Sequence, residues 1–90
     1  MRKVGFGVIG CGVISTAYLT AAKSFPHLEL RAVADMRSDA ARRKGEEFGV
    51  PGMRVDDLLK RDDIEIVLNL TVPLAHTDIS MAVLRAGKHV

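Results

Sequence analysis

Apolar residues follow two periods along the chain, one typical of buried strands and one typical of amphipathic helices. Residues 4–9 form a short run of apolar residues and glycine that ends in turn glycines, which predicts a buried parallel strand. Residues 13–25 carry apolar side chains at three- and four-residue spacing, which predicts a helix that Pro26 stops. Residues 28–35 alternate again and predict a second strand.

The middle of the chain repeats this order of helix and strand. Ser38 is predicted to cap a helix that runs to Phe48 and is stopped by Gly49, because a serine hydroxyl satisfies a free backbone N–H and glycine accepts the left-handed conformation. Residues 53–55 predict a short third strand, followed by a brief helix that Asp56 or Asp57 caps.

The last third of the chain contains the clearest strand. Residues 64–70 (IEIVLNL) are rich in β-branched residues, and Pro73 suits the first turn of a helix that continues to Gly87. Residues 88–90 begin a further element. Strands that alternate with helices need crossover connections, so the order predicts an α/β fold with a doubly wound parallel sheet.

Composition narrows the functional classes. The 90 residues are 48% hydrophobic and 27% charged, which is typical of one globular domain. A net charge of +2, with acids interleaved among the bases, predicts no nucleic-acid partner. The single cysteine, Cys11, excludes an internal disulfide, argues against a metal site and favours a reducing, cytoplasmic compartment. No apolar run is long enough to predict a membrane span.

The stretch GFGVIGCGVIS contains two overlapping matches to the dinucleotide-binding pattern G-x-G-x-x-G/A. The match at Gly5, Gly7 and Gly10 puts its first two glycines inside the predicted strand. The match at Gly10, Gly12 and Ser15 follows that strand and precedes a helix, as phosphate binding at a helix N-terminus requires. In this second register Gly10 makes the tight turn, Gly12 lets the backbone approach a pyrophosphate, and Ser15 replaces the usual Gly or Ala.

An acidic residue at the end of the second strand supports this interpretation. Asp35 stands where such folds hold the ribose hydroxyls, and its charge would repel a 2′-phosphate, which favours NAD over NADP. Arg37 keeps NADP possible, because a guanidinium can pair with that phosphate; a solvated loop arginine is the alternative interpretation. A purely structural glycine turn is the alternative for the whole motif.

Four segments together resemble one family. GVIGCGVIS, VADMRSDAAR, DDLLKRDDIEIVLNLTVPLAH and VLRAGKHV are similar, in order and spacing, to segments of the oxidoreductases typified by glucose-fructose oxidoreductase and inositol dehydrogenase, the Gfo/Idh/MocA family. The resemblance covers essentially the whole chain. It implies an NAD(P)-binding Rossmann domain over residues 1–90.

The resemblance also implies which residues contact the cofactor. It places Gly10, Cys11, Gly12, Val13 and Ile14 along the pyrophosphate, Asp35, Met36 and Arg37 around the adenosine, and Leu70, Thr71, Val72, Pro73 and His76 beside the nicotinamide half. The family often has proline directly after the threonine, whereas Val72 intervenes here. For His76, a hydrogen bond within the loop is an equal alternative to a cofactor contact.

In the family, the strand that begins as AGKHV continues into Glu-Lys-Pro, whose lysine is the usual acid-base residue. That motif lies beyond Val90, so no catalytic residue is assigned, the domain is expected to be incomplete at its C-terminal end, and the 90 residues alone are expected to be inactive. The implied activity is hydride transfer between a nicotinamide cofactor and a sugar, polyol or related hydroxyl compound, in a homo-oligomer. The alternatives are a standalone, non-catalytic dinucleotide-binding module and a truncated chain that pairs through its last strand.

Overall fold

A computed structural model describes residues 3–12, 18–20, 24–71 and 73–90. These residues form a four-stranded parallel sheet in the order β3-β2-β1-β4. The strands are β1 (Val4–Ile9), β2 (Leu28–Ala34), β3 (Gly52–Met53) and β4 (Ile66–Asn69), and the helices are α2 (Ser38–Phe48), α3 (Val55–Leu59) and α4 (Pro73–Arg85). Residues 18–20 are also helical. The predicted doubly wound α/β fold is therefore confirmed.

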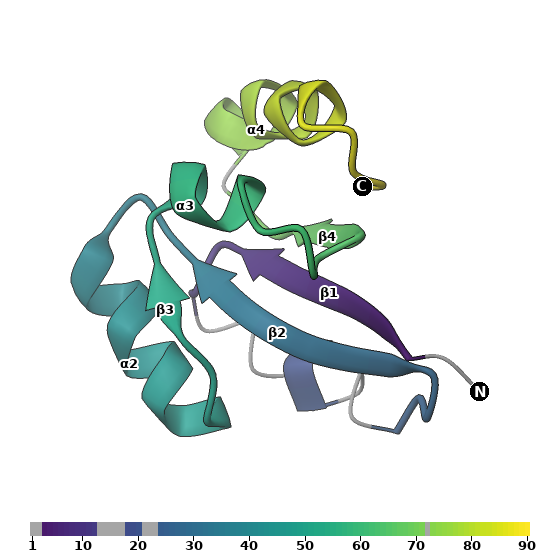
Figure 1. Cartoon of the computed structure of the whole chain (residues 1–90). Helices are drawn as coiled ribbons and strands as arrows, with labels where there is room; N and C mark the ends of the chain where they lie inside the picture. Colours follow the sequence, from purple (N-terminus) through teal and green to yellow (C-terminus); the bar gives the residue numbers. More distant parts are fainter. Residues whose placement is uncertain (1–2, 13–17, 21–23, 72) are drawn as a thin grey trace.

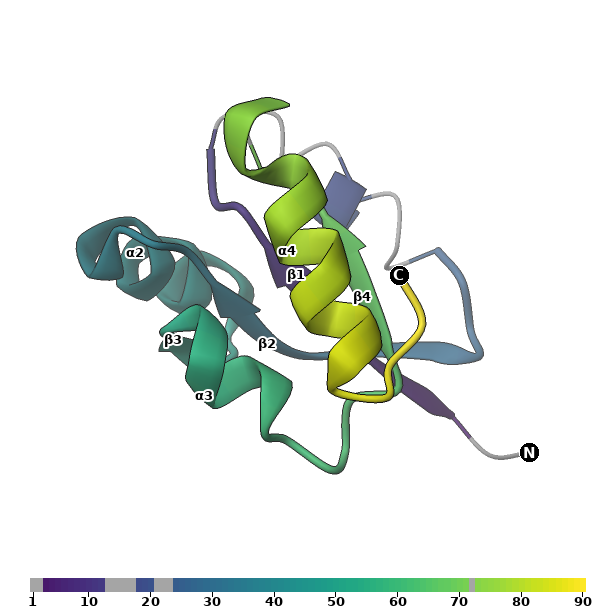
Figure 2. The ribbon, with the colours of Figure 1, turned by 90° about the horizontal axis from the view of Figure 1, so that it is seen from above.

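Helices cover both faces of the sheet. Helices α3 and α4 lie over one face, and α2 and residues 18–20 lie over the other (Figures 1 and 2). The core is divided accordingly. Ile9, Leu58, Ile64, Val67 and Val83 are buried on the α3–α4 face, whereas Phe6, Val8, Leu19, Val33 and Ala41 are buried on the α2 face. A sheet that buries both faces needs strands that are apolar on both sides, as the sequence of β1 is.

The strand order defines where the sheet changes direction. The chain runs from β1 to β2 to β3 on one side, and then returns to place β4 on the other side of β1. Ile9 pairs with Asn69 at the carboxyl ends of β1 and β4. In parallel sheets, ligands bind outside the carboxyl ends of the strands at this kind of switch point.

Two of the predicted helix caps are wrong. Arg37, not Ser38, is the N-cap of α2, and the Asp35 carboxylate shapes this turn by accepting a hydrogen bond from the Arg37 N–H at 2.8 Å. Arg54 is the N-cap of α3, so Asp56 and Asp57 lie in its first turn, where acidic side chains favour the positive end of the helix dipole. The predicted end of α2 is confirmed, because Gly49 has φ +70°.

Several predicted elements are shorter in the structure. Strand β4 is Ile66–Asn69 rather than 64–70, and the third strand is Gly52–Met53 rather than 53–55. Phe25 lies outside the helix that the spacing predicts over 13–25. Helix α4 begins at Pro73 as predicted but ends at Arg85, before Gly87 turns the chain with φ +78°.

Gly45 lies inside α2 although glycine lowers helix stability by up to about 1 kcal/mol relative to alanine. A Cβ at this position would lie 2.5 Å from the Val50 carbonyl oxygen and 2.7 Å from the Gly52 nitrogen. The glycine therefore lets the chain before β3 pass directly against the helix.

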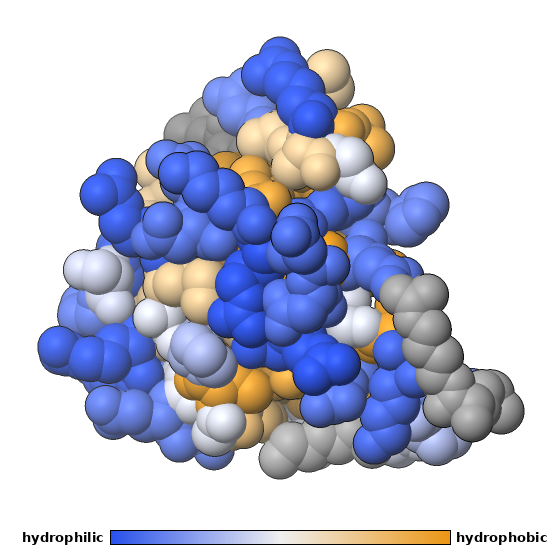
Figure 3. All heavy atoms as spheres, viewed as in Figure 1, coloured by the Kyte–Doolittle hydropathy of each residue, from blue (hydrophilic) through white to orange (hydrophobic). Residues whose placement is uncertain are grey.

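Hydrophilic side chains cover most of the face shown in Figure 3. The large apolar side chains that remain exposed include Met36, which is 77% exposed at the end of β2, and Leu84, which is 54% exposed on α4. Within the described ranges, no helix has the length and apolar character that a bilayer span requires.

Candidate functional site

Three loops converge at the carboxyl edge of the sheet. They follow β1, β2 and β4, and between them lies a cavity of about 390 Å³. Its lining residues are Gly10, Gly12, Asp35, Met36, Arg37, Leu70 and Thr71. The structure thus brings together seven of the residues that the sequence assigned to a cofactor site, from three segments far apart in the chain.

Gly10 makes the turn at the end of β1. Its φ is +105°, a conformation that residues with a side chain rarely adopt, and its N–H donates to the Ala34 carbonyl oxygen at 2.8 Å. A Cβ at Gly10 would lie 2.7 Å from both the carbonyl carbon and the carbonyl oxygen of Leu70. Only glycine lets the turn after β1 lie this close to the end of β4.

Gly12 has the opposite environment. No described atom lies within 4 Å of the position that its Cβ would occupy. A residue without a Cβ at this position lets a pyrophosphate approach the backbone closely. Gly5 and Gly7, which belong to the other register of the motif, instead pack inside β1 against the backbone of Asp63 and the side chain of Leu58.

The Asp35 carboxylate holds the glycine loop. Oδ2 accepts a hydrogen bond from the Cys11 N–H at 2.7 Å, and Oδ1 accepts one from the Arg37 N–H at 2.8 Å. Hydrogen bonds from backbone N–H groups to a carboxylate are among the stronger ones in proteins. Asp35 therefore joins the loop after β1 to the turn after β2, and it lines the cavity at the same time.

The Cys11 thiol is unreactive in this setting. It is 7% exposed and donates to the Ala34 carbonyl oxygen at 3.3 Å. Burial, reinforced by the negative charge of Asp35, raises the pKa of the thiol to about 11. A thiol that stays protonated at neutral pH is a poor nucleophile, so Cys11 serves this loop through its backbone N–H and its packing.

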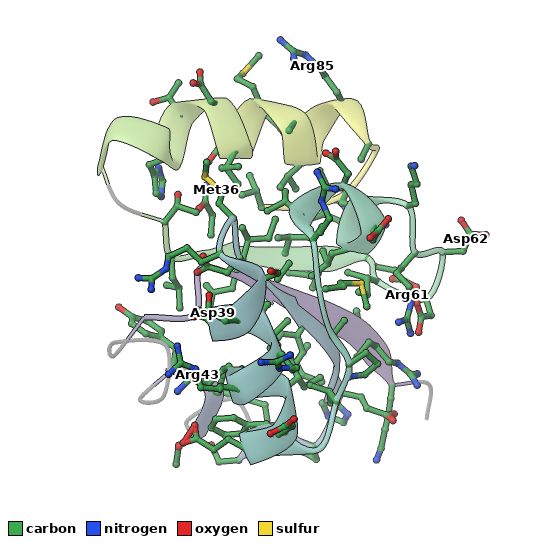
Figure 4. The ribbon with its side chains drawn as sticks, turned by 90° about the vertical axis from the view of Figure 1, so that its left-hand side faces the viewer. Met36, Asp39, Arg43, Arg61, Asp62 and Arg85 are labelled. Carbon is green, nitrogen blue, oxygen red and sulfur yellow. The ribbon has the colours of Figure 1, made fainter. Side chains whose placement is uncertain are left out.

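Arg37 is exposed and shares a partner with Arg43. The Arg37 Nη2 lies 3.9 Å from Asp39 Oδ2, and the Arg43 Nη2 lies 3.0 Å from the same oxygen. Figure 4 shows Asp39 near the start of α2, with Arg43 one turn further along. Arg37 thus lines the cavity, and it shares the Asp39 carboxylate with Arg43.

A second cavity of about 340 Å³ adjoins the first and shares Asp35 and Met36 with it. Its other lining residues are Arg54, Val55, Asp56, Ile79 and Ala82. Figure 4 shows Met36 between the end of β2 and α4. Sequence reasoning missed Arg54, although its place directly after the third strand puts it at the same edge of the sheet as Asp35.

Of the remaining predicted site residues, only His76 has a described side chain. His76 lies on the first turn of α4 with an exposed side chain, and its carbonyl oxygen accepts a hydrogen bond from the Asn69 Nδ2 at 2.9 Å. Val13, Ile14 and Val72, and the side chain of Pro73, lie outside the described residues. Sequence reasoning also missed Asn69, whose signal was a single amide side chain at the end of an otherwise apolar strand.

Together these features define a nucleotide-binding domain of the Rossmann type. They are β1 with the glycine turn that follows it, the acidic residue after β2, and the cavity at the switch point.

Comparison with known proteins identifies the family. The sequence model of the Gfo/Idh/MocA oxidoreductase family, described as an oxidoreductase family with an NAD-binding Rossmann fold, matches residues 4–90. The chain belongs to this family, as its sequence segments predicted.

Two curated relatives and one solved structure illustrate the match. The chain is 39% identical over 93 residues to dTDP-3,4-didehydro-2,6-dideoxy-alpha-D-glucose 3-reductase of Streptomyces violaceoruber, covering 100% of this chain and 27% of that protein. It is 31% identical over 86 residues to myo-inositol 2-dehydrogenase of Thermotoga maritima, covering 93% and 26%. A crystal structure of a 3-ketoreductase from Actinomadura kijaniata with NADP superposes with a TM-score of 0.90 at 36% identity, covering 99% and 29%. The chain therefore spans less than a third of the length of these relatives.

Proposed function

We propose that the chain is the cofactor-binding domain of an NAD(P)-dependent oxidoreductase that acts on a sugar, polyol or related hydroxyl or keto compound. The observation that carries this proposal is the cavity at the switch point, which Gly12, Asp35 and the loop after β4 line together. The substrate class follows from the relatives, which are named as a keto-sugar reductase and an inositol dehydrogenase.

We assign the pyrophosphate, the ribose and the adenine of the dinucleotide to residues of this site. The pyrophosphate would lie along the backbone from Gly10 to Gly12, and the ribose hydroxyls would donate to the Asp35 carboxylate. The second cavity, between Arg54 and Ile79, offers a flat cation and an apolar side chain to the adenine ring. When bound, the cofactor supplies the hydride chemistry, and the residues of this chain bind and orient it.

We expect NAD to bind more tightly than NADP. The Asp35 carboxylate would repel a 2′-phosphate on the ribose that it holds. Arg37 lines the cavity beside Asp35, and its partner Asp39, which it shares with Arg43, competes with a phosphate for the Arg37 guanidinium. NADP binding remains compatible with the site, because surface ion pairs of this kind contribute only about 0–1 kcal/mol each.

The test is a fluorescence titration of the chain with NADH and NADPH, compared with Asp35→Ser. We expect wild type to prefer NADH and Asp35→Ser to shift the preference toward NADPH by about tenfold or more, or about 1.4 kcal/mol. The ratio of the two affinities is the informative quantity, since loss of the Asp35 hydrogen bonds to the loop weakens both cofactors. Asp57→Ser, on the exposed side of α3, is the matched control. Absence of saturable binding of either cofactor by the folded chain would refute the proposal.

The wider setting of the protein is proposed on the same basis. We expect residues 1–90 to be completed by further chain that carries the acid-base residue and the substrate-binding domain, in a cytoplasmic homo-oligomer with a small-molecule substrate. No nucleic-acid or membrane partner is expected. A standalone dinucleotide-binding module would bind NADH equally well, and it would be distinguished by the absence of turnover in the complete protein.

A further inference from the structure

Asn69, the last residue of β4, uses the full hydrogen-bonding capacity of its side-chain amide. Its Oδ1 accepts from the Thr71 N–H at 3.2 Å and from the Thr71 hydroxyl at 2.6 Å. Its Nδ2 donates to the His76 carbonyl oxygen at 2.9 Å and to the Ser80 Oγ at 2.8 Å. An amide has two acceptor sites and two donor hydrogens, so all four are occupied.

Chemistry fixes the orientation of this amide. A backbone N–H can only donate, so the side of the amide that meets Thr71 must be the oxygen. A backbone carbonyl can only accept, so the side that meets His76 must be the nitrogen. Rotating the amide by a half-turn would lose both of these bonds, and Asn69 therefore holds one arrangement of the loop after β4.

The position of Asn69 in the sheet explains why one amide reaches both the loop and α4. Val67, two residues earlier on β4, packs with Val83 of α4 in the α3–α4 core, and alternation along a strand puts Asn69 on the same face. Asn69 is half-buried, and its bond to Ser80 ties the strand end to the second turn of α4. Loss of a partner for a half-buried amide is costly, so the network favours a single loop conformation.

The loop that Asn69 fixes forms one wall of the cofactor cavity. Leu70 and Thr71 line that cavity, and the Leu70 N–H donates to the Ile9 carbonyl oxygen at 2.8 Å. The Leu70 carbonyl lies directly against Gly10, as the 2.7 Å approach of a Gly10 Cβ indicates. A displaced Leu70–Thr71 segment would therefore change the shape of the cavity and also disturb the glycine turn at Gly10.

We propose that Asn69 is a positioning residue for cofactor binding, which acts through the Leu70–Thr71 wall and not through contact with the cofactor. The inference rests on the proposed function, since it assigns the cavity to a dinucleotide. It predicts that loss of the Asn69 hydrogen bonds weakens binding of the whole dinucleotide more than binding of its adenosine end. The adenosine end of the cofactor depends on Asp35 to Arg37, whereas the rest depends on the walls that meet at Gly10 and Thr71.

The experiment compares Asn69→Leu with wild type in the full chain, using NADH and adenosine as separate probes. Leucine keeps the size of the side chain and removes all four hydrogen bonds. We expect NADH affinity to fall about tenfold, or about 1.4 kcal/mol, and adenosine affinity to change by less than about twofold. Thr77→Val, an exposed change next to His76 on α4, is the control and should change neither affinity.

Two results would overturn the inference. A folded Asn69→Leu that binds NADH as wild type does would show that the network is irrelevant to binding, and an equal loss for NADH and adenosine would show a general structural role. If Asn69→Leu does not fold, Ser80→Ala removes one of the four bonds from outside the cavity. A loss of about twofold for NADH alone then supports the inference, and unchanged NADH binding overturns it. If wild type binds no NADH, the proposed function fails, and this inference fails with it.

Discussion

Gly10 and Gly12 belong to one loop, yet replacing each by alanine should have opposite consequences. Gly10→Ala forces a side chain into φ +105°, which costs about 1–3 kcal/mol, and pushes its Cβ to 2.7 Å from the Leu70 carbonyl. A domain of 90 residues has a total stability of about 5–14 kcal/mol, so this is a large fraction. For a loss of about 2 kcal/mol, the melting temperature should fall by about 8–16 °C.

Gly12→Ala places its methyl group where no described atom lies within 4 Å, and Gly12 has no positive φ. Its stability should stay within about 0.5 kcal/mol of wild type, or rise slightly because alanine restricts the unfolded chain. The same methyl group would occupy the space proposed for the pyrophosphate. NADH affinity should therefore fall by about tenfold or more, or about 1.4 kcal/mol.

The assay combines urea unfolding, followed by circular dichroism, with an NADH fluorescence titration on the same samples. Gly49→Ala is a useful comparison, since Gly49 also has positive φ, with no described atom near its Cβ position, and is far from the cavity. It should lose stability without losing NADH affinity. Equal stability losses for Gly10→Ala and Gly12→Ala, or a Gly12→Ala variant that binds NADH normally, would refute the assignment of roles within the loop.

Two further predictions concern stability. Because folding raises the pKa of the Cys11 thiol from 9.0 to about 11, the unfolded chain loses its proton first as pH rises. The contribution of this thiol to stability is therefore complete below pH 9 and is lost between pH 9 and about 11. Urea unfolding of wild type and Cys11→Ala across that pH range would measure this loss. Parallel stability–pH profiles for the two proteins would contradict the prediction. Lys88 is 9% exposed, and its Nζ donates to the carbonyl oxygens of Arg61 and Ile64 at 2.6 and 2.7 Å. Lys88→Met should cost about 1–3 kcal/mol in thermal unfolding, and a loss no larger than that of the exposed Lys60→Met would contradict this.

Much of the fold was predictable because its signals are local. The apolar run of β1, the alternation in β2 and the β-branched residues near β4 each predict a strand, and the structure has a strand at each of these places. Element boundaries were less predictable. Ser38 and Asp56 have the side chains of good caps, but the turns after β2 and β3 place Arg37 and Arg54 at the cap positions instead.

The sequence by itself determined the class of the protein and most of one site. The spacing of glycines after a strand, with an acid after the next strand, requires only local chemistry and chain order, so Gly10, Gly12 and Asp35 were identifiable. Tertiary structure decided which distant groups meet. The Asp35 carboxylate accepts hydrogen bonds from two different loops, and Asn69 bonds both to its own loop and to α4. The Cys11 thiol is buried by residues from other parts of the chain. Side-chain hydrogen bonds and burial depend on packing in three dimensions, and sequence periodicity alone carries no record of them.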